Sequence, residues 1–307
     1  MTLRVTFLGT SGAVPTVERA PSAVHLNREG ESLLFDCGEG TQRQMMRFGT
    51  GFDVSHLFVT HLHGDHVLGI PGLVQSMGFN DREAGLAIHG PPGTRRELQS
   101  LVHAGGTTPS FPVRVVENAP DTVALSGEGF EVRTFATEHR TTAVGYALVE
   151  DDRKGRFDRQ RAEEELGIPP GPKYGRLHDG EPVEHDGRVI QPEAVVGDPR
   201  PGRTVVYTGD TRPVAATESV ADGADLLIHD ATFVDEAADR ARSTGHATAR
   251  EAGEIAARAG VRRLALTHVS SRYAGRTHEL VAEAEAVFDG AVTLPDDGDE
   301  IEVSFQS

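Results

Sequence analysis

Residues 60–66 read Thr-His-Leu-His-Gly-Asp-His, and this stretch is the most informative in the chain because it places three imidazoles and a carboxylate within six positions. It follows residues 54–59, a short apolar run rich in Val and Phe that predicts a β-strand. A strand that runs out into a glycine-containing loop can direct several side chains toward one point. Imidazole nitrogen and carboxylate oxygen together suit zinc or another first-row divalent metal. The spacing therefore predicts a metal site at a strand end rather than a solvated loop that is rich in His by chance.

The composition is that of a globular chain without disulfides or membrane spans. Its 307 residues suffice for a large buried core. They contain no apolar run long enough to cross a membrane. The first residues alternate like a strand and lack the build of a signal peptide. Cys37 is the only cysteine, so no internal disulfide can form, and we expect residence in the cytoplasm.

The charge balance is unusual in one respect. A net charge of −17 normally argues against a nucleic-acid partner. However, Lys154 and Lys173 are the only lysines, and Arg supplies every other positive side chain. Abundant Asp and Glu with almost no Lys resembles the bias of halophiles that accumulate salt. We therefore interpret the net charge as an adaptation to a cytoplasm of high salt concentration. On this interpretation the net charge says little about the ligand.

The order of expected elements indicates an α/β fold. Strands are predicted over residues 3–9, 22–26, 32–36, 54–59, 86–89, 130–135, 204–207, 226–229 and 264–267, and helices over residues 41–48, 94–103, 247–259 and 277–288. Strands that first pair as meanders and then alternate with amphipathic helices suit two packed sheets flanked by helices. The sequence therefore predicts a four-layer αββα sandwich, with residues 1–307 as a single domain.

One segment, residues 151–195, interrupts this pattern. Its density of Pro and Gly predicts neither helix nor central strand. Residues 153–176 hold seven basic and four acidic side chains, against the acidic trend of the chain. We interpret the segment as an inserted flexible arm that binds a polyanion, with Lys154, Lys173 and Arg176 as candidate contacts, rather than as an inert insertion.

Further metal ligands are expected where other predicted strands end at the same rim. His139 follows the strand over residues 130–135, Asp210 follows the strand over residues 204–207, and His268 ends the strand over residues 264–267. The two oxygens of an aspartate placed after a Gly turn could bridge two ions. These three residues complete the candidate set that begins at residue 61.

The motif His-x-His-x-Asp-His after a strand resembles the signature of the metallo-β-lactamase superfamily. The resemblance implies the αββα sandwich and one or two metals at its edge. That superfamily includes lactamases, thiolesterases, flavoprotein oxidoreductases and nucleases, so this motif alone does not select a substrate.

Other motifs narrow the resemblance to the ribonuclease Z family in its short form. Residues 7–15 read Phe-Leu-Gly-Thr-Ser-Gly-Ala-Val-Pro, and residues 34–44 read Leu-Phe-Asp-Cys-Gly-Glu-Gly-Thr-Gln-Arg-Gln. The resemblance continues through residues 58–73, 230–233, 245–248 and 266–268, and it covers nearly the whole chain in order. It implies a cytoplasmic endonuclease that removes 3′ trailers from precursor tRNA, acts as a homodimer and clamps the tRNA body with its flexible arm.

The resemblance also implies roles for individual residues. One zinc ion would be held by His61, His63 and His139, the other by Asp65, His66 and His268, with Asp210 between them. Asp65 would accept a proton from the attacking water, and His246 would act at the leaving 3′ oxygen. The products would be tRNA with a 3′-hydroxyl and a trailer with a 5′-phosphate.

Departures from the family pattern are Val17 and Ala20, where the family often has Lys and Asn, and Ala247, where it has Ser. The first two affect the details of cleavage-site choice, and the third removes any role for a hydroxyl at that position. None of them touches the expected metal ligands.

Two other functions remain as alternatives. A small-molecule hydrolase of the same fold, thiolesterase-like or a lactamase, would not need the basic arm. A non-enzymatic RNA-binding module would have no use for a full set of metal ligands. A flavoprotein oxidoreductase is excluded because the chain leaves no room for a flavin-binding domain.

Overall fold

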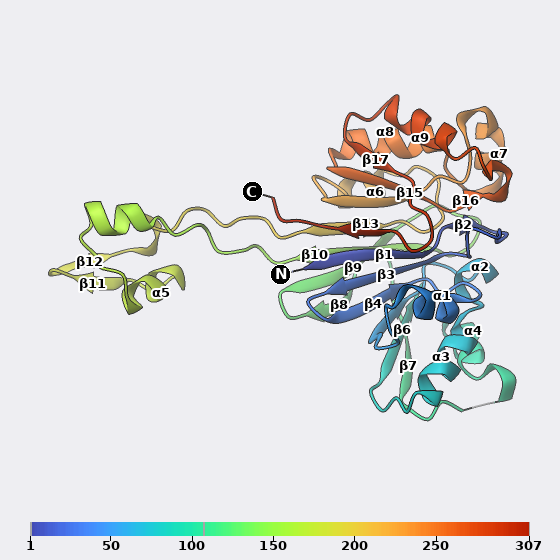
Figure 1. The fold of residues 1–307 in the computed structure, drawn as a ribbon, viewed down its shortest axis with the longest axis horizontal. Helices are drawn as coiled ribbons and strands as arrows, with labels where there is room; N and C mark the ends of the chain where they lie inside the picture. Colours follow the sequence, from blue (N-terminus) through green and yellow to red (C-terminus); the bar gives the residue numbers. More distant parts are fainter. Residues whose placement is uncertain (1, 107, 307) are drawn as a thin grey trace. The chain divides into compact units, whose positions relative to one another are not determined.

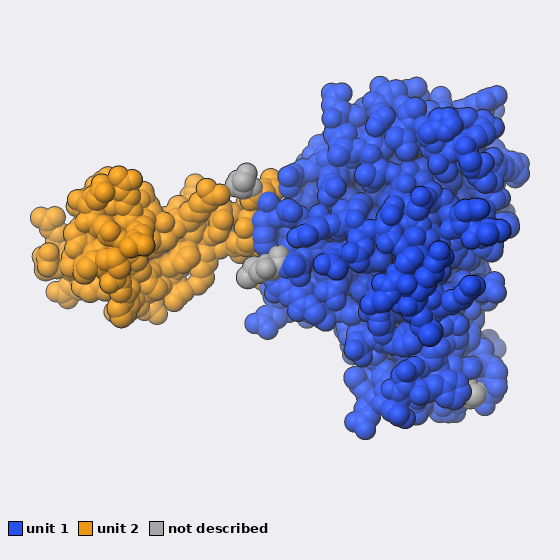
Figure 2. All heavy atoms as spheres, in the orientation of Figure 1, with its two compact units in different colours: residues 1–149, 203–305 blue, residues 150–202, 306–307 orange. Residues whose placement is uncertain are grey.

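The computed structural model describes residues 2–106 and 108–306, which form two compact units. Of the described residues, the larger unit comprises 2–106, 108–149 and 203–305, and the smaller comprises 150–202 and 306 (Figure 2). The smaller unit is thus inserted in the chain between two strands of the larger one.

The larger unit is built on two sheets, each seven-stranded within the described residues. In spatial order, the first sheet contains β18 (Glu300–Glu302), β1 (Leu3–Gly9), β3 (Ala23–Arg28), β4 (Glu31–Phe35), β5 (His56–Phe58), β6 (Leu86–Gly90) and β7 (Val113–Glu117). The second contains β17 (Ala291–Thr293), β15 (Arg263–Thr267), β14 (Leu226–Asp230), β13 (Thr204–Tyr207), β10 (Val144–Glu150), β9 (Phe130–Ala136) and β8 (Val123–Gly127). A short parallel pair joins β2 (Ser11–Gly12) to β16 (Val269–Ser270).

Helices cover the outer face of each sheet (Figure 1). The first sheet carries α1 (Thr41–Phe48), α2 (Gly64–Val67), α3 (Ile70–Phe79) and α4 (Arg95–Val102). The second carries α6 (Ala215–Val220), α7 (Ala238–Thr244), α8 (Ala249–Ala259) and α9 (His278–Glu285). Short η helices lie at η1 (Ala104–Gly106), η4 (Asp235–Ala237) and η5 (Ser271–Tyr273).

Three apolar clusters hold these four layers together. Alternate residues of a strand face opposite sides of its sheet, so each sheet contributes apolar side chains both to the space between the sheets and to the helices outside. Val5 and Phe7 of β1 pack between the two sheets against Val205 of β13. Leu34 of β4 faces outward to helices α1, α3 and α4. A third cluster packs Leu227 of β14 and its neighbours against the apolar face of α8 and α9. The predicted αββα sandwich is confirmed.

The predicted strands and helices are present with small shifts at their ends. The expected helix over residues 41–48 is α1 without change, whereas the one over residues 247–259 begins later, at Ala249. Its start is fixed by Thr248, whose side chain caps α8. The sequence does not predict strands β2, β7, β8, β10, β16, β17 and β18 or helices α2, α3, α6 and α7 of the larger unit.

The smaller unit corrects one expectation, because its segment contains regular structure despite its Pro and Gly. It holds a π-helical turn, η2 (Arg161–Glu165), the helix α5 (Pro172–His178), the antiparallel pair β11 (Val183–His185) and β12 (Arg188–Ile190), and η3 (Pro192–Ala194). Pro172 stands in the first turn of α5, where a missing N–H is not needed. Ala162, Ile168 and Leu177 belong to an apolar cluster of its own. Its service as a tRNA-binding arm stays a prediction.

Candidate metal centre

Residues 60–66 lie between the end of β5 and the short helix α2, which contains the last three of them. His61 and His63 lie in the loop, and Asp65 and His66 lie within α2. Asp65 comes close to residues 36–40, where a Cβ added at Gly38 would lie 2.4 Å from the Asp65 carbonyl oxygen. Glycine is therefore needed at position 38 so that the two loops can approach.

The second sheet delivers the remaining candidates to the same place. Strands β13, β14 and β15 run parallel, so their carboxyl ends meet at one edge. Asp210 follows β13, and His268 follows β15 directly. His139 follows β9, and its neighbour Glu138 pairs with Arg212 beside Asp210.

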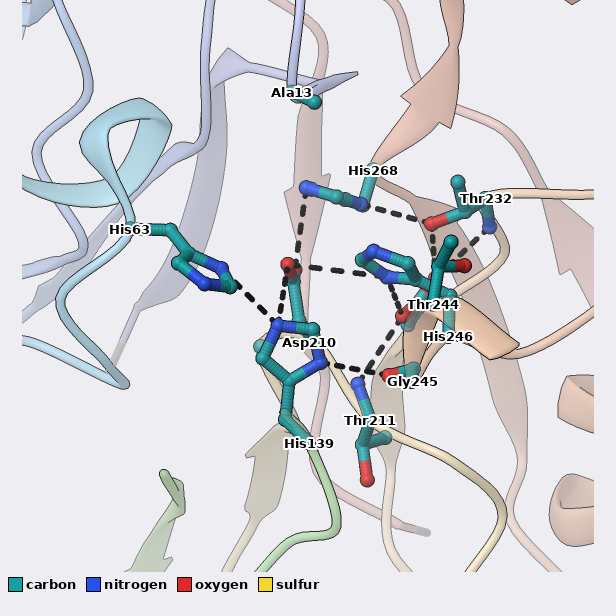
Figure 3. A network of polar contacts seen from close by, with 12 residues as sticks. Ala13, His63, His139, Asp210, Thr211, Thr232, Thr244, Gly245, His246 and His268 are labelled. Carbon is teal, nitrogen blue, oxygen red and sulfur yellow. Dashed lines mark hydrogen bonds and ion pairs between the residues drawn. The ribbon is translucent and has the colours of Figure 1, made fainter. Parts of the chain in front are cut away.

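The described residues form three groups of possible metal ligands, and two of them contain all seven candidates, while the third joins Asp210 and His268 to Asp230 and His246. His61, His63, His139 and Asp210 have potential ligand atoms within 4.8 Å of one another, and so do Asp65, His66 and His268. Asp210 lies between the groups, with Oδ2 at 3.6 Å from His61 Nε2 and Oδ1 at 3.2 Å from His268 Nε2. Figure 3 shows His63, His139 and His268 pointing toward Asp210. The structure brings the seven candidate residues together, and their role as ligands and their division between two ions stay predictions.

Four of the five histidines are oriented alike, with Nδ1 anchored and Nε2 toward the centre. The partners of Nδ1 are Thr60 Oγ1 for His61 (3.0 Å), Asp36 Oδ2 for His66 (2.7 Å), the Gly245 carbonyl oxygen for His139 (2.7 Å) and Thr232 Oγ1 for His268 (2.8 Å). Such partners fix the ring orientation and favour coordination through the other nitrogen.

Asp36 is a functional residue that the sequence reasoning missed. Besides His66, its carboxylate accepts hydrogen bonds from the Thr60 amide at 2.8 Å and from the Tyr207 hydroxyl at 2.8 Å. It therefore links the two sheets beneath the centre. Its only signal in the sequence is its position directly after β4, within the motif of residues 34–44.

Two buried atoms test whether these residues fit a cation. His66 Nε2 and Asp210 Oδ1 lie 3.2 Å apart, and neither makes a hydrogen bond to a described residue. Buried polar atoms are normally satisfied. An imidazole nitrogen and a carboxylate oxygen placed this way would be satisfied together by a divalent cation, so the donor set fits a divalent metal.

The pKa directions of His61, Asp65 and Asp210 suit the same purpose. That of His66 does not, because Asp210 and Asp36 outweigh its burial and raise its pKa well above the usual value. Burial raises the pKa of Asp210, but the nearby His268 and His66 outweigh burial and hold the pKa well below its usual value. Burial, with His66 nearby, keeps the pKa of His61 well below its usual value. The pKa of Asp65 is lowered by its hydrogen bond from His268 and by His66, against the opposing effect of burial. Ionised carboxylates and a neutral imidazole are the forms that bind metal.

His246 stands beside the ligand groups and is held by a carboxylate. Its Nδ1 lies 2.9 Å from Asp230 Oδ2, and its ring lies 5.1 Å from that of His268 (Figure 3). Burial lowers the pKa of His246, yet Asp230 outweighs burial and raises it to about 9. A charged imidazole near neutral pH can donate a proton.

The backbone is strained at three points of the centre. Ala13, Asp36 and His268 have φ of 59°, 57° and 61°, a region that residues other than glycine rarely adopt. Strain of this kind is found at functional sites, where the surrounding structure enforces it. At Ala13 the enforced conformation directs the backbone N–H toward Asp65 Oδ2, at 2.9 Å.

The candidate RNA contacts lie in the smaller unit and are paired within it. Lys154 Nζ is 2.5 Å from Asp179, and Arg176 Nε is 3.0 Å from Glu181. Lys173 Nζ donates to the Glu184 carbonyl oxygen at 2.6 Å. Their role in binding substrate stays a prediction.

Comparison with known proteins adds the family to this geometry. A family profile described as the beta-lactamase superfamily domain matches residues 181–269, and one described as anti-Pycsar protein Apyc1 matches residues 3–154. Ribonuclease Z of Halorubrum lacusprofundi is 65% identical over 99% of this chain and 98% of its own length. Ribonuclease Z of Haloferax volcanii is 64% identical over 99% and 96%. The crystal structure of human tRNase Z, short form, superposes with a TM-score of 0.71 at 28% identity, covering 98% of this chain and 100% of that one.

The sandwich and its His and Asp clusters thus define a protein of the metallo-β-lactamase fold that is built to hold a divalent metal. With relatives of such identity along nearly its whole length, the chain belongs to the ribonuclease Z family. None of the helices in the described part of the chain combines the length and apolar character that a membrane span requires.

Proposed function

We propose that this protein is a zinc-dependent endoribonuclease that removes the 3′ trailer from precursor tRNA. The observation that carries the proposal is the convergence of seven His and Asp side chains in a chain whose relatives are ribonuclease Z enzymes. His61, His63 and His139 would hold one zinc ion, Asp65, His66 and His268 the other, and Asp210 would stand between them. Two bound zinc ions would lower the pKa of a water molecule and stabilise the charge that develops on the phosphoryl oxygens.

The side chains of the centre perform the proton transfers. The oxygen of the attacking water forms a bond to phosphorus while the bond from phosphorus to the 3′ oxygen breaks. Asp65, kept ionised by His268 and His66, takes the proton of the water. His246, kept charged by Asp230, gives a proton to the departing 3′ oxygen. The products are tRNA with a 3′-hydroxyl and a trailer with a 5′-phosphate.

The setting follows from the family and the composition. We propose a homodimer in the cytoplasm of a halophile, with residues 151–195 as the arm that binds the tRNA body. The thiolesterase-like alternative is not favoured, because the relatives that match over 99% of the chain carry the ribonuclease Z name.

A direct assay tests the proposal. The full-length protein is purified in molar KCl, its zinc content is measured by mass spectrometry, and it is incubated with precursor tRNA carrying a labelled 3′ trailer. We expect two zinc ions per chain and a single cut that leaves a 3′-hydroxyl on the tRNA. A fully metallated protein that leaves the precursor intact but hydrolyses a thioester would overturn the proposal.

A further inference from the structure

Arg212 joins three loops of the metal centre. It follows Asp210 by two residues, and its backbone N–H donates to the Glu138 carbonyl oxygen at 2.8 Å. Glu138 in turn precedes His139, and its own N–H donates to Thr211 Oγ1 at 3.1 Å. These two backbone contacts fix the loop of His139 against the loop of Asp210.

The guanidinium of Arg212 reaches the third loop. It contacts both carboxylate oxygens of Glu251, through Nη1 at 2.9 Å and Nη2 at 2.5 Å. Nη1 also donates to the carbonyl oxygen of His246. The two side chains are only 14% and 18% exposed, so the ion pair is largely shielded from solvent. A two-pronged Arg–carboxylate pair in such a place is both strong and geometrically specific.

Glu251, which is paired with Arg212, also holds the turn between α7 and α8 through Thr248. Its Oε2 accepts the Thr248 N–H at 2.9 Å, and its own N–H donates to Thr248 Oγ1 at 3.2 Å. At the other end of the turn, Gly245 has φ of 74° and its carbonyl oxygen holds His139. His246 therefore lies in a turn that is tied at both ends.

Asp230 alone does not determine where the His246 ring lies. One hydrogen bond to Nδ1 directs the ring, but the ring also moves with its own backbone. Arg212 holds that backbone through the His246 carbonyl oxygen. The ring and the backbone are thus fixed by two different groups, Asp230 and Arg212.

We propose that Arg212, braced by Glu251, is a positioning residue that holds His246 at the distance where it can donate to the departing 3′ oxygen. The inference rests on the proposed function and adds to it a residue outside the proposed ligands and proton-transfer groups. Lysine cannot replace Arg212 fully, because one ammonium group cannot contact both carboxylate oxygens and the carbonyl oxygen in this planar arrangement.

The test compares two precursor tRNAs that differ in one atom. One has the natural 3′ oxygen at the cleaved bond, and the other has sulfur there, because a thiolate leaves without needing a proton. We expect Arg212→Gln to lower kcat on the oxygen substrate about 100-fold, the size of a lost general acid, with KM unchanged. On the sulfur substrate it should cleave at nearly the parent rate, and Arg212→Lys should fall between the two proteins on oxygen.

A matched control lies on α8, the helix that carries Glu251. Arg258, near the end of α8, also pairs with a carboxylate, with Nε at 2.8 Å from Glu218 Oε1, but its side chain is 48% exposed. Arg258→Gln should leave both substrates unaffected. If Arg212→Gln does not fold, Glu251→Gln should show the same difference between the substrates.

Two results would overturn the inference, namely an equal loss on both substrates, or no loss at all in a protein with its full metal content. The proposed function is judged separately, since it fails only if the parent protein does not cleave the oxygen substrate.

Discussion

In four of the five candidate histidine ligands, the ring nitrogen Nδ1 is held by a protein group while Nε2 faces the centre. Asp36 makes this clear, because it holds His66 through Nδ1 and is itself held by Thr60 and Tyr207. A ligand fixed in this way loses little freedom when it binds a cation. We therefore expect the buried pair of Asp36 and His66 to contribute to the affinity of the centre for a divalent metal.

Asp36→Asn should weaken metal binding about 10- to 100-fold, because the amide cannot accept as many hydrogen bonds with the same strength. Zinc affinity is measured by competition with a coloured chelator. His25→Gln is the control, since His25 is also buried and makes one hydrogen bond, to Ser32 Oγ at 2.7 Å, away from the centre. Equal zinc affinity in the Asp36 variant and the parent would contradict this role.

Asp65→Ala should remove a metal ligand and the proton acceptor together. We expect turnover of trailer-bearing tRNA to fall by about 10²- to 10⁴-fold, as for a lost general base. Circular dichroism should show an intact fold, because Asp65 is outside the three apolar clusters of the sandwich. Turnover within tenfold of a fully metallated parent would refute the assignment.

Helix α8 packs on the core of the larger unit with its apolar face and borders the metal centre with its first turn. Its apolar face packs into the cluster behind the second sheet, and its first turn carries Glu251. The capping box of Thr248 and Glu251 satisfies N–H groups that a helix leaves free at its start. The capping box therefore stabilises α8 as far as its first residues, which directly follow the turn that contains His246.

Thr248→Ala should lower the free energy of unfolding by about 1 kcal/mol, the usual cost of losing a side-chain cap. Thr277→Ala provides the comparison, because Thr277 holds the same position before α9 but makes no side-chain cap bond. Unfolding is followed by circular dichroism in denaturant at constant molar KCl. Equal losses in the two variants would show that the cap of α8 contributes nothing.

The inserted unit can be separated from the chemistry by replacement. Exchange of residues 151–201 for a short Gly-Ser linker should leave the zinc content and the hydrolysis of a small phosphodiester nearly unchanged, because no proposed ligand lies there. Cleavage of precursor tRNA should collapse, mainly through a higher KM.

A milder variant isolates the basic side chains of that unit. Substitution of Lys154, Lys173 and Arg176 by Gln should reproduce part of the loss in tRNA affinity while the apolar cluster of the unit keeps its fold. Normal tRNA processing by the linker protein would make the insertion inert, and loss of zinc would make it part of the larger unit.

The sequence predicted what depends on local pattern. Alternating strands such as residues 3–9 and the rim positions of His139, Asp210 and His268 follow from hydrophobic period and order along the chain. Strand β10 was missed because its residues are nearly all buried, and such a strand shows no alternation. The Gly245 carbonyl oxygen that holds His139 leaves no trace in the sequence. The helix α5 of the insertion is not predicted, because proline breaks a helix in its interior but is tolerated in its first turn, where Pro172 lies.

The acidic surface concerns the whole molecule. With 47 carboxylates against 30 basic side chains, self-repulsion opposes the folded state in dilute buffer. Screening shortens the Debye length to about 3 Å at 1 M salt. We expect both the fold and the activity to require molar KCl.

Circular dichroism and cleavage across a KCl series measure this requirement. An equal osmolality of sorbitol is the control, because it changes hydration without screening charge. Full stability in dilute buffer would refute the halophilic interpretation.

If the candidate residues hold metal as proposed, a bound cation would clamp the two sheets of the larger unit together. Each ligand group takes residues from the loop after β5 of the first sheet and one histidine from the second, His139 or His268. A cation bound there does what a disulfide does in other proteins, and Cys37, the only cysteine, cannot supply one. A ligand that binds only the folded chain adds about 4 kcal/mol when its free concentration is 1,000 times its dissociation constant. On the proposed ligand set, we expect removal of the metal to lower the heat resistance of the protein as well as its activity.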